Sequence, residues 1–225
     1  MIGILGEKVG MTHVFSEKGE LIPVTVIKAG PCFVVQKKEK ERDGYEALQV
    51  GYGQGKAKNF PKPLTGHFQK ASLSPLRFLR EFRVDRIDDY QVGQEIKVNI
   101  FNKGDIVNVQ GYSKGRGFTG VVKRHGFRGG PRSHGQSDRL RAPGSIGGSS
   151  FPSRVFPGTK MAGRMGMEKK VIRNLKIIEV VEEDNLLLVK GSVPGRKKGV
   201  LVVTKVKEGK ENKSKETKEK NGHSG

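Results

Sequence analysis

The sequence has a single cysteine, Cys32, and no tryptophan among its 225 residues. A lone cysteine excludes an internal disulfide and a cysteine-based zinc site, which favours a reducing, cytoplasmic compartment. Hydrophobic residues make up 34% of the chain, enough for a core in part of it but hardly in all of it. No run approaches the roughly 18 to 20 apolar residues that a transmembrane helix requires. The N-terminus has neither a signal-peptide nor a transit-peptide pattern.

Acidic residues are also scarce. The chain has 23 Asp or Glu against 43 Lys or Arg, which gives a net charge of +20 and an isoelectric point near 10.1. Such a surplus works against a compact state unless a polyanion neutralises it. We find no basic amphipathic helix with a clear apolar face, so the sequence favours nucleic acid over a membrane as the partner.

Two blocks of the chain, residues 1–112 and 171–206, are rich in short apolar runs. In the first block we expect strands around 21–27 and 32–35, and Ile96, Val98 and Ile100 alternate with polar residues as in a strand. The stretch of about 40–90 is less regular and predicts a small α+β insertion, with a helix near 65–71. In the second block, strands around 174–181 and 186–189 flank a hairpin turn, and a last strand begins at Val200.

The segment between these blocks, residues 113–170, has a different composition. Its 58 positions hold 13 Gly, 13 Lys or Arg and only two acids, a net charge of +11. It lacks apolar periodicity and its charges repel, so it cannot bury itself. A loop of this length is usually a binding loop or disordered. We therefore expect one sheet or barrel completed by both blocks, with an extended basic arm looped out between them, and a disordered tail at 207–225.

Several motifs could suggest nucleotide binding, a metal site or catalysis, but their sequence context argues against each of these functions. Residues 115–120 fit G-x-G-x-x-G, but the segment that follows breaks before it could complete a helix and a second strand, so dinucleotide binding is disfavoured. His125 and His134 have no nearby cysteine and few acids, which makes a poor zinc set. Cys32 is expected to be a small core residue. We predict no catalytic residue, metal, cofactor or small-molecule substrate, and hence no enzyme.

The composition of the arm suits RNA. Arg and Lys neutralise phosphates and release counterions, Gly permits close approach of the backbone, and Phe or Arg planes stack on unpaired bases. The irregular placing of the prolines favours one defined path over a flexible tether. The candidate RNA-binding residues are the following: Lys114, Arg116, Lys123, Arg124, His125, Arg128, Arg132, His134, Arg139, Arg141, Arg154, Lys160, Arg164, Lys169 and Lys170.

A series of long motifs, in order along residues 1–206, points to a known family. They are GEKVGMT (6–12), IPVTVI (22–27), DGYEALQVG (43–51), GHF (66–68), SKGRGFTGV (113–121), SHG (133–135), RAPGSIG (141–147), KMAGRMG (160–166) and NLLLVKG (185–191). In these motifs the chain closely resembles the bacterial form of the large-subunit ribosomal protein L-three family.

The resemblance implies a mainly β fold, in which a six-stranded translation-protein-type β-barrel bears an inserted α+β part and an arm that enters rRNA. It implies a cytoplasmic structural constituent of the large ribosomal subunit, which binds the large rRNA near its 3′ end early in assembly. Its neighbours would belong to the L-fourteen and L-nineteen families. The arm tip would lie near the peptidyl transferase centre; we assign it to Ser145, Ile146, Gly147, Gly148, Ser149 and Ser150.

Two departures from the family pattern concern the arm. Some relatives have a methylated glutamine at the tip, but residues 147–151 contain no Gln; many have a Trp where this chain has His125. The competing interpretation is a free-standing RNA chaperone or RNA-binding regulator. It would share the charge and the arm but would not need a multi-strand body with ordered motifs.

Overall fold

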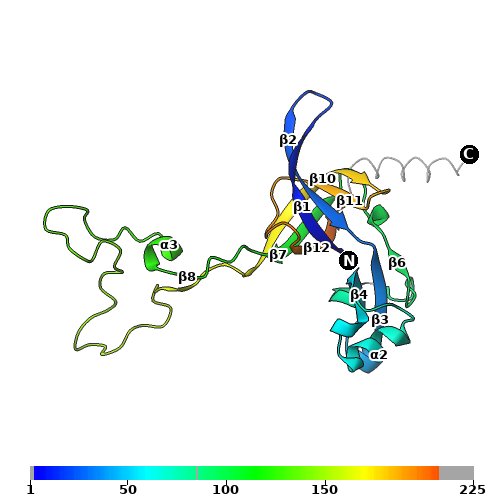
Figure 1. Cartoon of the computed structure of the whole chain (residues 1–225), viewed down its shortest axis with the longest axis horizontal. Coiled ribbons are helices and arrows are strands. Elements are labelled where there is room, and N and C mark those ends of the chain that lie inside the picture. Colours follow the sequence, from blue (N-terminus) through cyan, green and yellow to red (C-terminus); the bar gives the residue numbers. More distant parts are fainter. Residues whose placement is uncertain (1–2, 85, 208–225) are drawn as a thin grey trace, which may run out of the picture. The chain divides into compact units, whose positions relative to one another are not determined.

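The structure, a computed structural model, describes residues 3–84 and 86–207. The described residues divide into two compact units, one formed by residues before 113 together with those from 169 onward, and the other by Ser113–Glu168. Figure 1 labels most of the elements. The mainly β fold expected from the sequence is confirmed. Among the described residues, no helix is long and apolar enough to cross a membrane.

Six antiparallel strands of the first unit close into a barrel in the order β1-β12-β7-β10-β11-β2. They span Gly3–Phe15 (β1), Leu21–Ala29 (β2), Ile106–Tyr112 (β7), Lys169–Val181 (β10), Leu186–Lys190 (β11) and Val200–Lys207 (β12). Alternate residues point into the barrel, as period-two side-chain geometry requires. Val107 and Val109 of β7, for example, are fully buried, as are Leu187 and Val189 of β11.

A second, four-stranded antiparallel sheet has the order β5-β4-β3-β6. Its strands are Cys32–Lys38 (β3), Ala47–Gln54 (β4), Leu76–Arg83 (β5) and Glu95–Ile96 (β6). Three short helices accompany it, α1 (Lys40–Asp43), η1 (Ala57–Asn59) and α2 (Lys62–Lys70). The insertion expected at about 40–90 is therefore part of a sheet that already begins at β3, and the expected helix is α2.

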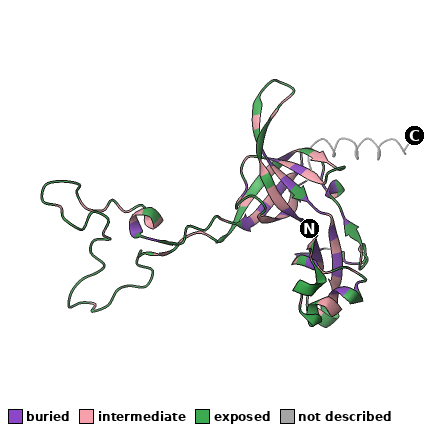
Figure 2. Cartoon of the chain, viewed as in Figure 1, coloured by how far each residue is buried: buried purple, intermediate pink, exposed green. Residues whose placement is uncertain are grey.

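The barrel and the second sheet share one hydrophobic core. Ile4 and Leu5 of β1 are fully buried and belong to the same cluster as Val34, Leu48 and Phe82 of the second sheet. Consecutive residues of β1 are thus buried on both faces, because one face lines the barrel and the other meets the sheet. Figure 2 shows the buried residues concentrated in these two sheets.

The expected strand through Ile96, Val98 and Ile100 is wrong beyond Ile96. After β6 the chain forms a 3₁₀ turn, η2 (Val98–Ile100), closed by the Phe101 N–H donating to the Val98 carbonyl at 3.0 Å. Val98 and Phe101 are both buried in the shared core. The residues placed in the core are therefore three apart, as a tight turn requires, and not alternate residues as in a strand.

The other strands expected near the C-terminus are confirmed. Val181 pairs with Leu186 across the turn at 182–185, where Asn185 adopts a left-handed conformation with φ of +53°. β12 begins at Val200 as expected. The predicted disordered tail lies outside the described residues except for Lys207, the last residue of β12.

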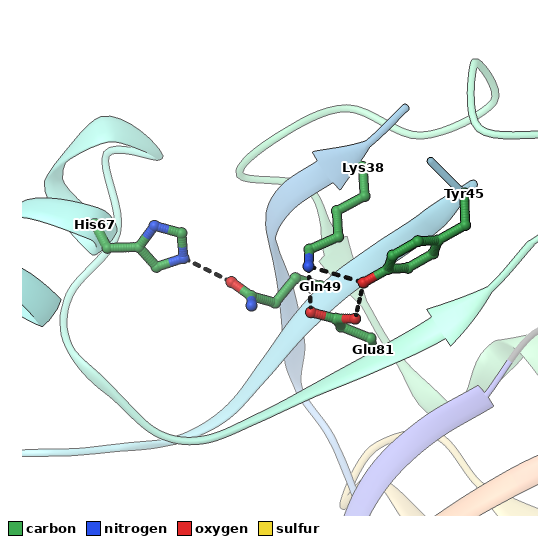
Figure 3. A network of polar contacts seen from close by, with 5 residues as sticks. All are labelled: Lys38, Tyr45, Gln49, His67 and Glu81. Atoms are coloured by element: carbon green, nitrogen blue, oxygen red, sulfur yellow. Dashed lines mark hydrogen bonds and ion pairs between the residues drawn. The ribbon is translucent and has the colours of Figure 1, made fainter. Parts of the chain in front are cut away.

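A polar network lies on the second sheet (Figure 3). Lys38 Nζ lies 2.8 Å from Glu81 Oε1 and 2.9 Å from the Tyr45 hydroxyl, which donates to Glu81 Oε2 at 2.8 Å. The bonds from Lys38 and then Tyr45 lower the pKa of Glu81, and the bonds to Glu81 and Tyr45 raise that of Lys38. His67 Nε2 lies 2.6 Å from Gln49 Oε1, which extends the network to α2.

Cys32 is confirmed as a core residue. Its side chain is fully buried at the start of β3, and its thiol donates to the Leu5 carbonyl at 3.4 Å. Burial raises the pKa of the thiol to about 12, so the reactive thiolate is suppressed at neutral pH.

Candidate nucleic-acid interface

The second unit, Ser113–Glu168, begins as a two-stranded stem. The Ser113 N–H donates to the Glu168 carbonyl, and the Arg116 N–H donates to Met165, each at 2.9 Å. The short strands β8 (Phe118–Thr119) and β9 (Gly163–Arg164) continue this pairing. The base of the arm is therefore a backbone-paired ribbon, although the sequence has no strand alternation there.

Glycine makes one close approach in this stem possible. Gly166 has φ of +77°, and a Cβ at that position would lie 2.2 Å from the Lys114 carbonyl oxygen. No other residue fits this conformation and spacing without moving the opposite chain.

A one-turn helix, α3 (Val121–His125), follows the stem and is tied back to it. Arg124 Nη1 donates to the Met161 carbonyl at 2.8 Å, and His125 Nε2 lies 3.0 Å from the same oxygen. Both side chains are half-buried. Arg124 and His125, which we predicted to contact RNA, thus also hold the two sides of the arm together.

Beyond α3 the arm forms two loops with very little core. Residues 129–142 make the first, closed by the Gly130 N–H donating to the Leu140 carbonyl at 3.0 Å. His134 lies within it, exposed and with φ of +60°. Within the whole of Ser113–Glu168 only Thr119 and Val121 are buried. The arm must therefore derive its order from local bonds and from whatever it binds.

The predicted tip, residues 145–150, lies in the second loop, and each of its residues is exposed. Its turns rest on local hydrogen bonds, such as Ser145 Oγ donating to the Gly147 carbonyl at 3.1 Å and Ser153 Oγ donating to Ser150. A Cβ on Gly147 would have only the Arg154 carbonyl near it, at 3.8 Å, whereas one on Gly148 would lie 2.9 Å from the Phe151 carbonyl. The protein leaves room for a side chain at Gly147 but not at Gly148.

Most of the predicted RNA-binding residues are exposed around the stem and loops. These are Lys114, Arg116, Lys123, Arg128, Arg132, His134, Arg139, Arg141, Arg154, Lys160 and Arg164. Asp138 lies 4.0 Å from Arg139, with both side chains 84% exposed, so it neutralises little of this charge.

Lys169 and Lys170 are located differently from the prediction. They pair with Tyr112 and Gly111 as the first residues of β10. The arm therefore ends at Glu168, two residues before the predicted boundary at residue 170, because the barrel strand β10 begins at Lys169. Both side chains are exposed, but they belong to the barrel.

The list of candidate residues omitted the exposed aromatic side chains of the arm. Phe118 is 80% exposed, Phe151 91% and Phe156 58%. The Arg154 guanidinium lies 5.9 Å from the Phe156 ring centroid, a cation–π arrangement that presents a planar, cationic surface. The composition of the arm had already suggested that Phe planes stack on unpaired bases, and these three rings are exposed as that role requires.

The described residues of the arm form an exposed surface of cations and aromatic rings. Among the described residues, no three His, Cys, Asp or Glu side chains gather closely enough to hold a metal ion. The arm instead presents cations and aromatic faces on an extended scaffold, an arrangement suited to positioning against phosphates and bases.

Comparison with known proteins agrees with this architecture. Residues 81–185 match the family described as ribosomal protein L3. The large ribosomal subunit protein uL3 of Carboxydothermus hydrogenoformans is 55% identical over 208 residues, which cover 92% of this chain and 99% of that protein. The uL3 protein of Brachyspira pilosicoli is 52% identical over 215 residues, which cover 96% of this chain and 98% of that protein. The uL3c protein of Cyanophora paradoxa is 55% identical over 206 residues, which cover 92% of this chain and 98% of that protein.

Identity of this degree over nearly the whole of both chains defines a structural protein of the large ribosomal subunit. The chain belongs to the ribosomal protein L3 family, which confirms the resemblance seen in its motifs. It is a ribosomal protein of the translation machinery, located with the large subunit in the cytoplasm.

Proposed function

We propose that this protein binds large-subunit rRNA directly through the arm at Ser113–Glu168, and that the arm becomes fully ordered on RNA. The single observation that supports this most strongly is the arm itself, which has a backbone-paired stem, two buried residues and a row of exposed cations. A scaffold without a core that concentrates charge requires a polyanionic partner to fill the space around it.

The family relationship supports a more detailed role. We propose that binding occurs near the 3′ end of the large rRNA, early in subunit assembly, and that the barrel is of the translation-protein type. Residues 145–150 then lie near the peptidyl transferase centre, and members of the L-fourteen and L-nineteen families are the neighbouring proteins. In this role the tip positions rRNA and performs no chemistry: Gly147 and Gly148 carry no side chain, and the serine hydroxyls of the tip are not proposed as catalysts.

Binding to an in vitro transcript of large-subunit rRNA tests the proposal. The variant Arg128→Gln/Arg132→Gln/Arg141→Gln removes three exposed arm cations, and Lys18→Gln/Lys40→Gln/Arg42→Gln removes three from the first unit as a matched control. Each phosphate contact contributes about 0.7 to 0.9 to the slope of log affinity against log salt. We expect the arm variant to lower that slope by about 2 to 3 and the control to leave it unchanged. Equal effects would contradict the placement of the interface.

A free-standing RNA chaperone or regulator would also bind such a transcript. Sedimentation separates the two functions, because a subunit constituent remains with the large subunit through a moderate salt wash. Loss of the protein from washed subunits would favour the alternative.

A further inference from the structure

A second concentration of positive charge lies outside the arm, in the turn that leads into β12. Residues 195–199, which we term the basic turn, read Gly-Arg-Lys-Lys-Gly. Arg196, Lys197 and Lys198 are all exposed and form no ion pair with any described residue. The sequence contains no Asp or Glu from residue 185 to residue 207, so nothing within this stretch neutralises them.

The backbone of the basic turn is held firmly. The Lys198 N–H donates to the Lys8 carbonyl at 2.8 Å, and the Lys8 N–H donates to the Gly199 carbonyl at 3.0 Å, which pins the turn to β1. The Gly199 N–H closes the turn by donating to Arg196 at 3.0 Å. Gly195 has φ of +94°, and a Cβ there would lie 2.8 Å from the Tyr112 carbonyl. Three cations are therefore displayed from a preformed loop.

Further positive charge surrounds the basic turn. The Lys8 ammonium donates to the carbonyls of Val193 and Gly195, at 2.8 and 3.4 Å, so it lies directly against the start of the turn. Lys197 Cε lies near the backbone of Gly10, 3.8 Å from where a Cβ would be. Its stem is thus packed on β1 while the side chain remains exposed.

Two more residues extend this surface across the barrel, and one acid faces away from it. Tyr112 is 50% exposed, and its register partner Lys169 on β10 is exposed as well. Glu7, the acid next to Lys8, projects from the opposite face of β1 because side chains alternate along a strand, and its charge acts on Tyr52 of the second sheet.

We propose that the basic turn, with Lys8 beneath it and Lys169 and Tyr112 beside it, is a second RNA-binding site that grips backbone phosphates independently of the arm. This inference rests on the proposed function, since it assumes that the protein's partner is RNA. Lysine is depleted at the core of protein–protein interfaces, so consecutive exposed lysines favour RNA over an acidic protein. Tyr112 supplies a ring on which an unpaired base can stack.

Rigidity explains why the basic turn is a site and not merely a charged loop. Cations held on a preformed backbone lose little conformational entropy when they bind, so more of each phosphate contact appears as affinity. The arm, in contrast, has little core and becomes ordered on RNA. The two sites therefore contribute differently, the turn as a docking point and the arm as a penetrating element.

Salt-dependent binding of the full chain to the rRNA transcript tests this site. The variant Arg196→Gln/Lys197→Gln/Lys198→Gln keeps the backbone hydrogen bonds of the turn and removes only charge. We expect the log-log salt slope to fall by about 2 to 3 and the affinity at 0.1 M salt to fall roughly 10- to 100-fold. The control Lys18→Gln/Lys40→Gln/Arg42→Gln removes equal charge elsewhere in the same unit and should leave both unchanged.

Directed cleavage locates the contact. Because Cys32 is buried with a raised pKa, an iron chelate that reacts with thiols labels a new surface cysteine selectively. Arg196→Cys and Ser149→Cys place the chelate at the turn and at the arm tip respectively. We expect each labelled protein to cut the bound rRNA, at different positions.

The outcomes separate the two proposals. Weakened binding in the turn variant together with cleavage from position 196 supports the second site. Parental affinity in the turn variant and no cleavage from 196, with the arm variant impaired, overturns the second site and leaves the proposed function intact. Failure of the parent protein to bind the transcript removes both. A turn variant that binds RNA normally but fails to enter subunits in the presence of the other ribosomal proteins indicates a protein partner and overturns the RNA assignment.

Discussion

Arg124 donates from Nη1 to the backbone carbonyl of Met161 at 2.8 Å, although 37 residues separate them in the sequence. This bond joins the helix α3 to the returning side of the arm, two residues before β9 begins. A residue that composition marks as a phosphate ligand therefore also has a structural role within the protein.

The stem should loosen when this bond is removed. In Arg124→Ala, we expect faster hydrogen exchange at the amides of Arg116 and Met165, which bond across the stem at 2.9 Å. The physical reason is that a short two-stranded ribbon is marginal without further contacts. Exchange mass spectrometry of the free protein measures this, with Arg132→Ala as a control that keeps the stem contacts. Unchanged exchange in Arg124→Ala would show that the backbone pairing is sufficient.

Proteolysis should distinguish the arm from the barrel. We expect trypsin to cut the free protein first after the exposed cations from Arg128 to Lys160, because this segment has almost no core and opens at little cost in free energy. The barrel strands should be cut later, and rRNA should protect the arm sites. Peptide mapping over a time course checks the order of cleavage. Equal protection of arm and barrel in the free protein would contradict the prediction.

The tip should influence peptidyl transfer without performing chemistry, if it lies where the family relationship places it. Gly147→Asp is the informative change, because the protein itself leaves room for a side chain there. A charge about 5 Å from a phosphate costs about 0.8 kcal/mol at the dielectric constant of water and about 3 kcal/mol at an effective value of 20. We expect slowed single-turnover peptide transfer or altered drug sensitivity in purified mutant ribosomes. Ser149→Ala should be silent, and an inactive Ser149→Ala would reveal a chemical role.

A buried ion pair should stabilise the barrel. The Asp105 carboxylate is fully buried; it accepts from the Asn102 N–H at 2.9 Å and lies 3.0 Å from Lys205 Nζ, whose side chain is 20% exposed. We expect Asp105→Asn to lower the free energy of unfolding by about 2 to 4 kcal/mol, because the Lys205 ammonium loses the negative charge of this carboxylate but can still reach some solvent. Urea denaturation measures the change. Asp88 is exposed, so Asp88→Asn serves as a control that should change the free energy of unfolding by less than about 0.5 kcal/mol.

The second sheet should show a pH-dependent contribution from Glu81. Its hydrogen bonds to Lys38 and Tyr45 lower its folded pKa below the ordinary value of 4.5. A depressed carboxyl pKa adds stability that is present above the unfolded pKa and is lost as pH falls through the folded pKa. We expect the difference in melting temperature between the parent and Glu81→Gln to be constant above about pH 5.5 and to shrink below pH 4.5. Glu41→Gln, on α1, should show no such change, and a difference independent of pH would refute the assignment.

The sequence by itself determined which part of the chain forms a folded body and which part forms the basic arm. A segment with +11 charge and no apolar periodicity cannot form a core, so residues 113–170 had to lie outside the body almost as the structure divides them. Alternating apolar residues likewise determined most of the strands, including both sides of the turn at 182–185. The motifs determined the family, because their order along the chain is specific. These are local properties, which a chain expresses before any distant segment is placed.

Tertiary structure alone decided which segments meet. Period-two alternation shows that a strand has a buried face but not which strand lies beside it, so the pairing of β12 with both β1 and β7 could not be derived from the sequence. The same applies to the stem of the arm, whose strands lack alternation and are joined by backbone bonds between residues more than 40 positions apart, such as Ser113 and Glu168. The role of Arg124 and the clustering of Lys8 with the basic turn depend on these long-range pairings. The sequence gives the charge of each side chain, but the long-range pairing of the strands determines which partner that side chain contacts.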